Sequence, residues 1–166
     1  MQETYVEPIA KVIRNKQKLE KALDVKITNK GKLVFVDGDA EKEYTALEVL
    51  EAINLGFSTD RALLLTENGM MLQTVNIKDI TKRQDLERVR GRIIGKQGKA
   101  LSTIKKLTNC PISLQDNQIG IIGNAEKIEE AIQAVKSIIL GSKHGNVYSR
   151  TEKEMKKRRI RDKEGI

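Results

Sequence analysis

Apolar positions recur at helical spacing in two stretches of the sequence that resemble one another. Gly38–Gly56 aligns without gaps on Gly123–Gly141, and eight of the 19 pairs are identical. The apolar face of the second stretch consists of Ile128, Ala131, Ile132, Val135, Ile138 and Ile139, and the matching face of the first consists of Ala46, Leu47, Leu50 and Ile53. Asp39 and Asn124 suit N-caps, and the final glycine of each stretch suits the C′ position. Each stretch is therefore predicted to be an amphipathic helix.

Short apolar runs typical of strands precede each of these helices. In the second copy, Ile112–Leu114 and Ile119–Ile122 flank a QDNQ turn. In the first copy, Val25–Thr28 and Leu33–Val36 flank a turn that contains Gly31. Each copy is therefore predicted to contain a β-hairpin followed by a helix.

Three further elements lie upstream of the second hairpin. Lys99–Thr108 and Arg83–Ile94 are predicted to be helices, and Leu72–Ile80 a strand, which completes the order β-α-α-β-β-α for residues 72–141. The first copy has the same order in shortened form, with about one helical turn missing before its hairpin. Between the copies, GFSTDRALLL is predicted to be a linking helix capped by Ser58 or Thr59.

Charge separates the two halves of the chain. Residues 1–81 contain 11 Lys/Arg and 13 Asp/Glu, whereas residues 82–166 contain 20 and 10. A positive excess confined to one half indicates a surface that meets a polyanion, although a solvated surface is the alternative. The single cysteine, Cys110, is predicted to be a buried thiol, and the single histidine, His144, to cap a helix or lie in a solvated turn. Neither supports catalysis, and we predict no enzyme activity, cofactor or metal site.

The segment GRIIGKQGKALSTIKKL, Gly91–Leu107, carries the most informative motif. Gly95 and Gly98 bracket a tight turn between two predicted helices. This resembles the signature of KH domains, a GxxG loop that clamps the backbone of about four nucleotides. Glycines let phosphates approach the main chain, and the helix that begins near Lys99 offers free N–H groups and its positive dipole end. The predicted RNA-binding residues are Arg90, Arg92, Ile93, Ile94, Gly95, Lys96, Gln97, Gly98, Lys99, Lys105, Lys106 and Ser113.

The surroundings of this motif favour RNA binding over other functions. Seven basic residues and no acidic residue lie between Arg88 and Lys106, and bases are expected in an apolar groove lined by Ile93, Ile94 and the strand that contains Ser113. A glycine turn without any ligand is the alternative. The spacing of an NTPase phosphate-binding loop is not met. RRM and OB folds need stacking aromatics, and the chain has only five aromatic residues.

The corresponding loop of the first copy has lost its glycines, because Arg14 and Gln17 replace them. We therefore predict an α+β fold of two tandem type I KH domains, each a three-stranded antiparallel sheet covered by helices. The expected parts are a degenerate KH domain at 1–56, a linking helix and loop at 57–71, a KH domain with intact GxxG at 72–148 and a basic C-terminal helix or tail at 149–166. The degenerate domain is expected to serve packing or to hold a protein partner. The basic segment is either an accessory RNA contact or a frayed, solvated helix.

Three sequences resemble a particular family, the KH-domain ribosome-assembly proteins called partner-of-Nob-one or Dim-two. They are INLGFSTDRALLL between the copies, GRIIGKQGKA at the loop, and GSKHGNVY after the last predicted helix, which is similar to the family's HG-x-VY motif. The resemblance covers the chain from Ile9 to about Arg159 and favours an archaeal member.

This resemblance implies a small-subunit ribosome assembly factor. Its second KH domain would bind single-stranded RNA near the 3′ end of 16S-type ribosomal RNA, and its protein partners would be the nuclease that matures this RNA or a translation initiation factor. A generic KH-domain regulator that binds messenger RNA, or a protein-interaction scaffold without RNA contact, are the alternatives. With no apolar stretch near the ~18 residues of a membrane span and no signal-peptide pattern, the protein is expected in the cytoplasm, without membrane contact.

Overall fold

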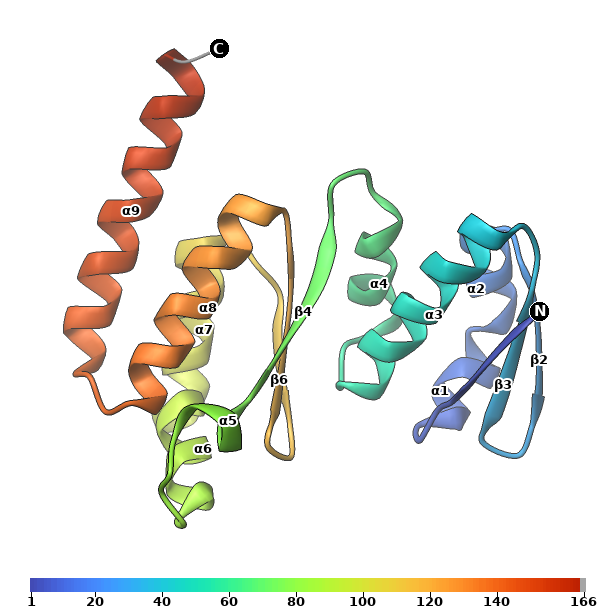
Figure 1. Cartoon of the computed structure of the whole chain (residues 1–166), viewed down its shortest axis with the longest axis horizontal. Helices are drawn as coiled ribbons and strands as arrows, with labels where there is room; N and C mark the ends of the chain where they lie inside the picture. The colour runs from blue at the N-terminus through green and yellow to red at the C-terminus, as the bar shows by residue number, and fades with distance from the viewer. Residues whose placement is uncertain (165–166) are drawn as a thin grey trace. The chain divides into compact units, whose positions relative to one another are not determined.

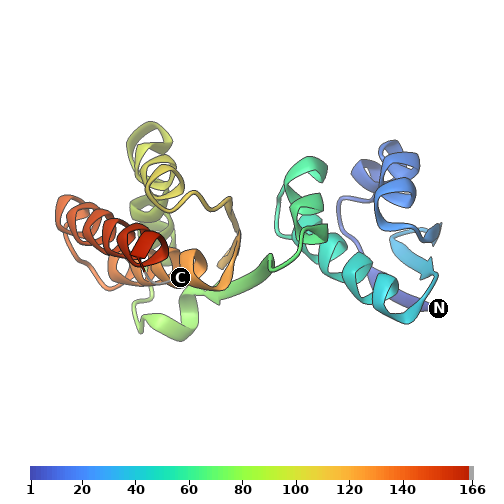
Figure 2. The ribbon, with the colours of Figure 1, turned by 90° about the horizontal axis from the view of Figure 1, so that it is seen from above.

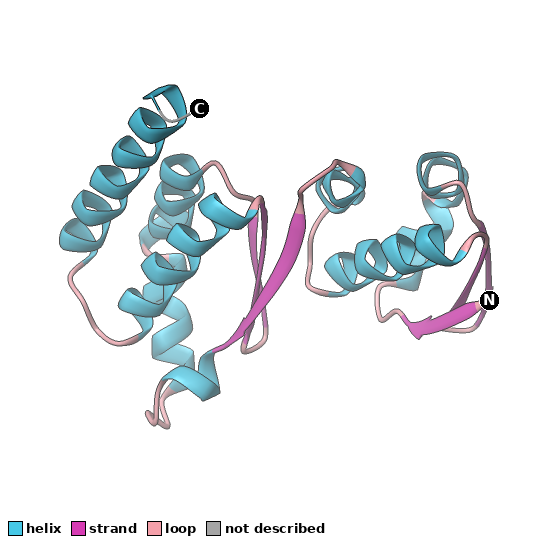
Figure 3. Cartoon of the chain, turned by 45° about the horizontal axis from the view of Figure 1, so that its top comes forward, coloured by secondary structure: helices cyan, strands magenta, loops and turns pink. Residues whose placement is uncertain are grey.

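The structure, a computed structural model, describes residues 1–164 as two compact units, one from Met1 to Leu72 and one from Gln73 onward. Each unit contains a three-stranded antiparallel sheet with its helices gathered on one side (Figures 1 and 3). The predicted α+β class is confirmed. The order β-α-α-β-β-α is present in both units, with one additional short helix in the second.

Unit 1 is built around β3, the central strand of its sheet. Its elements are β1 (Gln2–Tyr5), α1 (Ile9–Arg14), α2 (Lys16–Leu23), β2 (Lys26–Lys30), β3 (Leu33–Asp37), α3 (Ala40–Asn54), α4 (Thr59–Ala62) and a 3₁₀ turn (Leu63–Thr66). The strand order is β1-β3-β2, and Val34 and Val36 of β3 are fully buried under the helices. The segment expected to link the copies packs within this unit, because Phe57, Ala62 and Leu65 are buried.

Unit 2 repeats this topology with strand order β4-β6-β5. Its elements are β4 (Met71–Asn76), α5 (Ile77–Ile80), α6 (Leu86–Ile94), a 3₁₀ turn (Lys96–Gly98), α7 (Lys99–Thr108), β5 (Ile112–Gln115), β6 (Gln118–Gly123), α8 (Ala125–Ile139) and α9 (His144–Glu164). The bounds of α7 confirm the prediction. The predicted strand and first helix were both too long, because the Asn76 side chain accepts a hydrogen bond from the Lys78 N–H and caps α5, while Arg83 pairs with Asp85 in the turn before α6.

Equivalent hydrogen bonds tie the first strand of each unit to its hairpin turn. The Val6 N–H donates to the Lys32 carbonyl at 2.8 Å, and the Ile77 N–H donates to the Asn117 carbonyl at 2.9 Å. Lys32 and Asn117 are related by the same offset of 85 as the aligned helices α3 and α8. The repeat in the sequence is therefore a repeat in the hydrogen bonding of the backbone.

The predicted caps differ in how they act. The Asn124 side chain accepts from the Lys127 N–H at 2.9 Å and caps α8 as expected. Asp39 occupies the N-cap position of α3 but makes no capping hydrogen bond there, and its carboxylate lies 3.7 Å from the Lys42 ammonium instead. The Ser58 hydroxyl caps α4 by accepting from the Arg61 N–H at 3.3 Å. The final glycines of the repeats have φ of 97° and 98°, which confirms their C′ role.

The thiol of Cys110 is buried, as predicted, and lies 3.5 Å from the Thr108 carbonyl oxygen. Burial raises the pKa of this thiol, so the reactive thiolate is disfavoured. A Cβ on Gly123 would come within 2.7 Å of the sulfur, so the side chain fills the space beside β6. Cys110 is therefore a packing residue. Within residues 1–164, none of the helices is long and apolar enough to cross a membrane.

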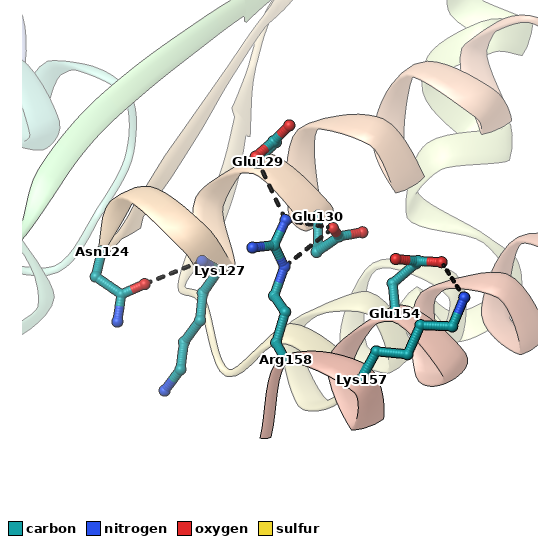
Figure 4. A network of polar contacts seen from close by, with 7 residues as sticks. All are labelled: Asn124, Lys127, Glu129, Glu130, Glu154, Lys157 and Arg158. Carbon is teal, nitrogen blue, oxygen red and sulfur yellow. Dashed lines mark hydrogen bonds and ion pairs between the residues drawn. The ribbon is translucent and has the colours of Figure 1, made fainter. Parts of the chain in front are cut away.

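Helix α9 packs on α7 and α8, on the side away from the sheet (Figures 1 and 2). One stripe of the helix is buried and consists of Val147, Thr151 and Met155. Beyond this stripe the Arg158 guanidinium binds Glu130 of α8 at 2.8 and 3.1 Å and lies 3.4 Å from Glu129 (Figure 4). The basic C-terminal segment, predicted as either an RNA contact or a frayed helix, is thus a packed helix along most of its length.

Arg158→Ala is expected to destabilise unit 2 by about 1–2 kcal/mol, because it leaves the carboxylate of Glu130, only 12% exposed, without its charged donor. The matched control is Lys157→Ala, which removes a neighbouring, more exposed pair with Glu154 and should cost less than about 0.5 kcal/mol. Native-state hydrogen exchange of the α7 and α8 amides measures both changes. Equal effects would show that the Arg158 contact does not hold α9.

Candidate nucleic-acid interface

The loop between α6 and α7 is a tight turn with three positive φ angles. Gly95, Gln97 and Gly98 have φ of 78°, 56° and 73°. Two backbone hydrogen bonds close it, from the Gly95 N–H to the Gly91 carbonyl at 2.8 Å and from the Gly98 N–H to the Gly95 carbonyl at 3.1 Å. A chain that turns through the left-handed region in this way favours glycine, so the motif identified in the sequence is required by the backbone.

The two glycines of the loop have different roles. A Cβ on Gly95 would lie 2.4 Å from the Cβ of Ala100 and 2.7 Å from its backbone nitrogen, so α7 begins in contact with the end of α6. A Cβ on Gly98 would meet no described atom within 4 Å. Gly95 therefore permits the packing of the two helices, whereas Gly98 leaves open space on the outer side of the turn.

Positive charge surrounds this open side. The side chains of Lys96, Gln97 and Lys99 are exposed, and so are those of Arg88 and Lys106. Within residues 1–164, the ammonium groups of Lys96, Lys99 and Lys106 have no hydrogen-bond or carboxylate partner. The first turn of α7 has no side-chain cap, and the Lys99 N–H donates to the Lys96 carbonyl within the 3₁₀ turn. The positive end of the helix dipole and the uncommitted lysines thus lie together, an arrangement that favours anions.

Other predicted RNA-binding residues are engaged within the protein. The Arg90 guanidinium donates to the Asn117 side-chain oxygen at 2.5 Å, and that of Arg92 donates to the Ser142 carbonyl at 2.7 Å. Ile93 has no exposed surface, whereas Ile94 is 40% exposed. The apolar surface next to the loop therefore comes from Ile94, because the neighbouring isoleucine points into the core.

Two more predicted residues, Lys105 and Ser113, are half-buried on α7 and β5. The strand β5 is an edge strand of the sheet, and it follows α7 in the sequence. The structure thus places Lys96, Gln97 and Lys99 together at the loop, with the half-buried pair farther along the chain.

The sequence did not predict the residues between α8 and the start of α9 that contact the end of α6. The His144 ring nitrogen Nε2 lies 2.8 Å from the Arg92 carbonyl oxygen, and Ser142 provides the carbonyl that binds the Arg92 side chain. His144 was expected to cap a helix or lie in a solvated turn, and its ring contacts the C-terminal end of α6. The HG-x-VY resemblance marked this turn as unusual, but only the fold shows what it touches.

The equivalent position in unit 1 is a junction without left-handed residues. Helix α1 ends at Arg14 and α2 begins at Lys16, and Asn15 between them has φ of −108°. The Asn15 side chain donates to the Lys11 carbonyl at 2.7 Å, and its N–H is also bonded within α1. No open turn is formed here, so the geometry that characterises the second loop is lost together with the glycines.

Two sheets of order 1-3-2 with a glycine turn between paired helices define a type I KH-domain protein. The family model for the second KH domain of PNO1, described as a eukaryotic-type (type I) KH domain, matches residues 71–156. The chain belongs to the PNO1/Dim2 family of KH-domain proteins.

Relatives in archaea and fungi match at moderate identity. A KH domain-containing protein of Methanocaldococcus jannaschii is 31% identical over 149 residues, which are 86% of this chain and 66% of that protein. The pre-rRNA-processing protein PNO1 of Debaryomyces hansenii is 40% identical over 104 residues, 61% of this chain and 41% of that protein. The chain thus spans less than two thirds of the length of these curated relatives.

A solved structure resembles most of the chain. It is a complex of a/eIF2alpha, aDim2p and rRNA from Pyrococcus horikoshii, and the match has a TM-score of 0.83 at 33% identity. It covers 94% of this chain and 95% of the matched chain. The likeness therefore extends over both units and supports the same fold for each.

Gly95→Ala is expected to destabilise unit 2 by about 2–4 kcal/mol, because the new Cβ adds a clash with Ala100 to an unfavourable φ. Gly98→Ala carries only the backbone cost of about 1 kcal/mol, since its Cβ meets open space. Chemical unfolding of the full chain, followed through unit 2 amide signals, measures the difference. Similar losses for the two variants would contradict the distinct roles assigned to these glycines.

Proposed function

We propose that this chain is an RNA-binding assembly factor of the small ribosomal subunit. Its second KH unit holds single-stranded RNA near the 3′ end of 16S-type ribosomal RNA. The observation that carries the proposal is the loop Gly95–Gly98, which combines open backbone with exposed lysines at the start of α7. The protein acts by binding in the cytoplasm and performs no catalysis of its own.

The loop would bind RNA through its backbone rather than through base edges. Phosphates can approach Gly98 closely because no side chain stands in the way, and the positive dipole end of α7 then attracts the phosphate oxygens. Lys96 and Lys99 flank the same point and neutralise the phosphates. Ile94 offers exposed apolar surface beside the loop, where an unstacked base can lie. Sequence preference would come from this surface and from β5.

The proposal that the bound RNA is ribosomal rests on the relatives. The fungal relative is named a pre-rRNA-processing protein, and the matched archaeal structure is a complex with rRNA and a/eIF2alpha. These names support small-subunit rRNA as the ligand of this chain, and an initiation-factor subunit or the maturation nuclease as its protein partner. Unit 1, which lacks the open turn, would serve packing or hold that partner.

Lys96→Asp together with Gln97→Asp is expected to reduce affinity for single-stranded RNA by at least about 30-fold, because two carboxylates would then face the phosphates at the open turn. Both side chains are exposed, so the fold should remain intact. The matched control places the same charges at the equivalent loop of unit 1, as Lys16→Asp with Gln17→Asp. Fluorescence anisotropy with a short RNA measures both.

The control variant should retain affinity within about threefold, since its added charges act only at long range. Equal losses in the two variants would show that the charge of the whole chain, and not the loop of unit 2, determines binding. Unchanged binding in the unit 2 variant would rule out the loop as the RNA clamp.

Crosslinking in the native cells, followed by sequencing of the bound RNA, tests the biological part. Crosslinks are expected to cluster at the 3′ end of the small-subunit rRNA, and the protein should co-sediment with small-subunit precursors. Crosslinks spread over messenger RNAs would indicate a generic regulator instead. An absence of RNA crosslinks, with intact co-sedimentation, would favour a protein-interaction scaffold.

A further inference from the structure

The end of α6, just before the loop Gly95–Gly98, is tied to the turn between α8 and α9 by two hydrogen bonds that run in opposite directions. The Arg92 guanidinium donates to the Ser142 carbonyl at 2.7 Å, and the His144 Nε2 lies 2.8 Å from the Arg92 carbonyl. A carbonyl oxygen can only accept, so Nε2 must carry the hydrogen in this contact. Residue 92 thus uses both its side chain and its backbone to hold a segment 50 residues away in the sequence.

The acceptor of the histidine is an otherwise unpaired end of α6. The last four carbonyls of an α-helix have no partner within the helix, and Arg92 lies among them because α6 ends at Ile94. His144 therefore caps the C-terminal end of the helix that leads into Gly95. The direction in which α6 ends determines where the open turn lies.

Unit 1 contains the same tie in a simpler form. The Lys11 ammonium donates to the Phe57 carbonyl at 3.2 Å. Lys11 matches Arg92 in the alignment of the two loops, and Phe57 matches Ser142 in the alignment of α3 and α8. A basic residue three positions before the loop holds the residue that follows the C′ glycine in both units. The contact therefore belongs to the repeated architecture, and it is not an accident of one surface.

The second bond is present only in unit 2. The residue of unit 1 that matches His144 is Thr59, and α4 begins at Thr59 as α9 begins at His144. The Thr59 hydroxyl is buried and finds no hydrogen-bond partner in the part of the chain that the structure describes. The unit with the open turn has the additional cap, and the unit that lost its glycines lacks it.

We infer that Arg92 and His144 are positioning residues for the RNA clamp, an inference that rests on the proposed function. They do not contact RNA. They hold the end of α6 against the α8–α9 turn so that Gly95–Gly98 is already in its binding geometry before RNA arrives. Pre-ordering a binding loop increases affinity because less conformational entropy is lost on binding.

The test replaces His144 in the full-length chain. His144→Ala is expected to weaken binding of a short single-stranded RNA by about 3- to 15-fold, which corresponds to the loss of one hydrogen bond and its ordering effect. In the RNA-free protein, amide exchange at residues 95–98 should become faster. His144→Gln, whose side-chain amide can donate to the same carbonyl, should restore part of both effects. Thr59→Ala in unit 1 is the matched control and should change neither.

Two results would overturn the inference. One is unchanged RNA affinity in His144→Ala. The other is a loss of affinity without faster exchange at residues 95–98, which would show that the histidine acts on RNA directly. Because loop exchange is measured without RNA, it reports on positioning even if the RNA proposal itself fails. If the wild-type chain had no affinity for RNA, the proposed function would be wrong, and loop exchange would still test the positioning role.

Arg92 offers an independent check. Arg92→Lys should keep RNA affinity within about threefold, because Lys11 shows that an ammonium can reach the equivalent carbonyl, whereas Arg92→Ala should loosen the loop and lower affinity. If Arg92 bound a phosphate directly, Arg92→Ala would lower the salt dependence by about 0.7 log units per log unit of salt and leave loop exchange unchanged. That pair of results would contradict the positioning role.

Discussion

The second unit depends on how closely α7 follows α6. With the Cβ position of Gly95 only 2.7 Å from the Ala100 nitrogen, the two helices meet without space for a side chain. The chain must then turn through left-handed conformations at residues 95, 97 and 98, which opens the backbone on the outer side. Packing on the inner side and openness on the outer side are two consequences of the same turn. In unit 1 the junction has a single residue, Asn15, whose side chain closes it.

The divergence of the two copies can be followed through their shared hydrogen bonds. The offset between equivalent residues is 71 at Val6 and Ile77, 81 at Lys11 and Arg92, and 85 at the hairpin and final helix. Unit 1 is thus ten residues shorter before its loop and four shorter after it. The ten residues correspond to α5, the segment 81–85 that follows it and the start of α6, and the four to part of the helix after the loop. Unit 1, whose segments on both sides of the loop are shorter, has no open turn but has the same sheet and the same tie to the turn after α3.

Elements determined by local patterns could be predicted from the sequence. The repeat placed α3 and α8, the limits of α7 were those expected, and Cys110 lies in the core. Some errors arose where the partner is remote in sequence, and others at local contacts such as the Asn76 cap of α5. Nothing near Arg92 indicates that its side chain is held by Ser142, 50 residues away. Asp39 pairs with Lys42, only three residues on, and makes no capping bond. The packing of α9 could not be predicted either. Its buried stripe includes the polar Thr151, and Arg158 contributes an ion pair, so the sequence shows no continuous apolar face.

The basic character of unit 2 therefore has two separate uses. Arg90, Arg92 and Arg158 are committed to Asn117, Ser142 and Glu130, where the planar guanidinium with its several donors suits fixed acceptors. Lys96, Lys99 and Lys106 remain exposed and uncommitted, as expected of compact charges that neutralise phosphates. These arginines hold elements of the fold together, and the lysines, with Arg88, supply the exposed positive charge near the loop. The net positive charge is thus larger than the exposed basic surface beside the loop, because part of it lies on arginines that are held by contacts within the protein.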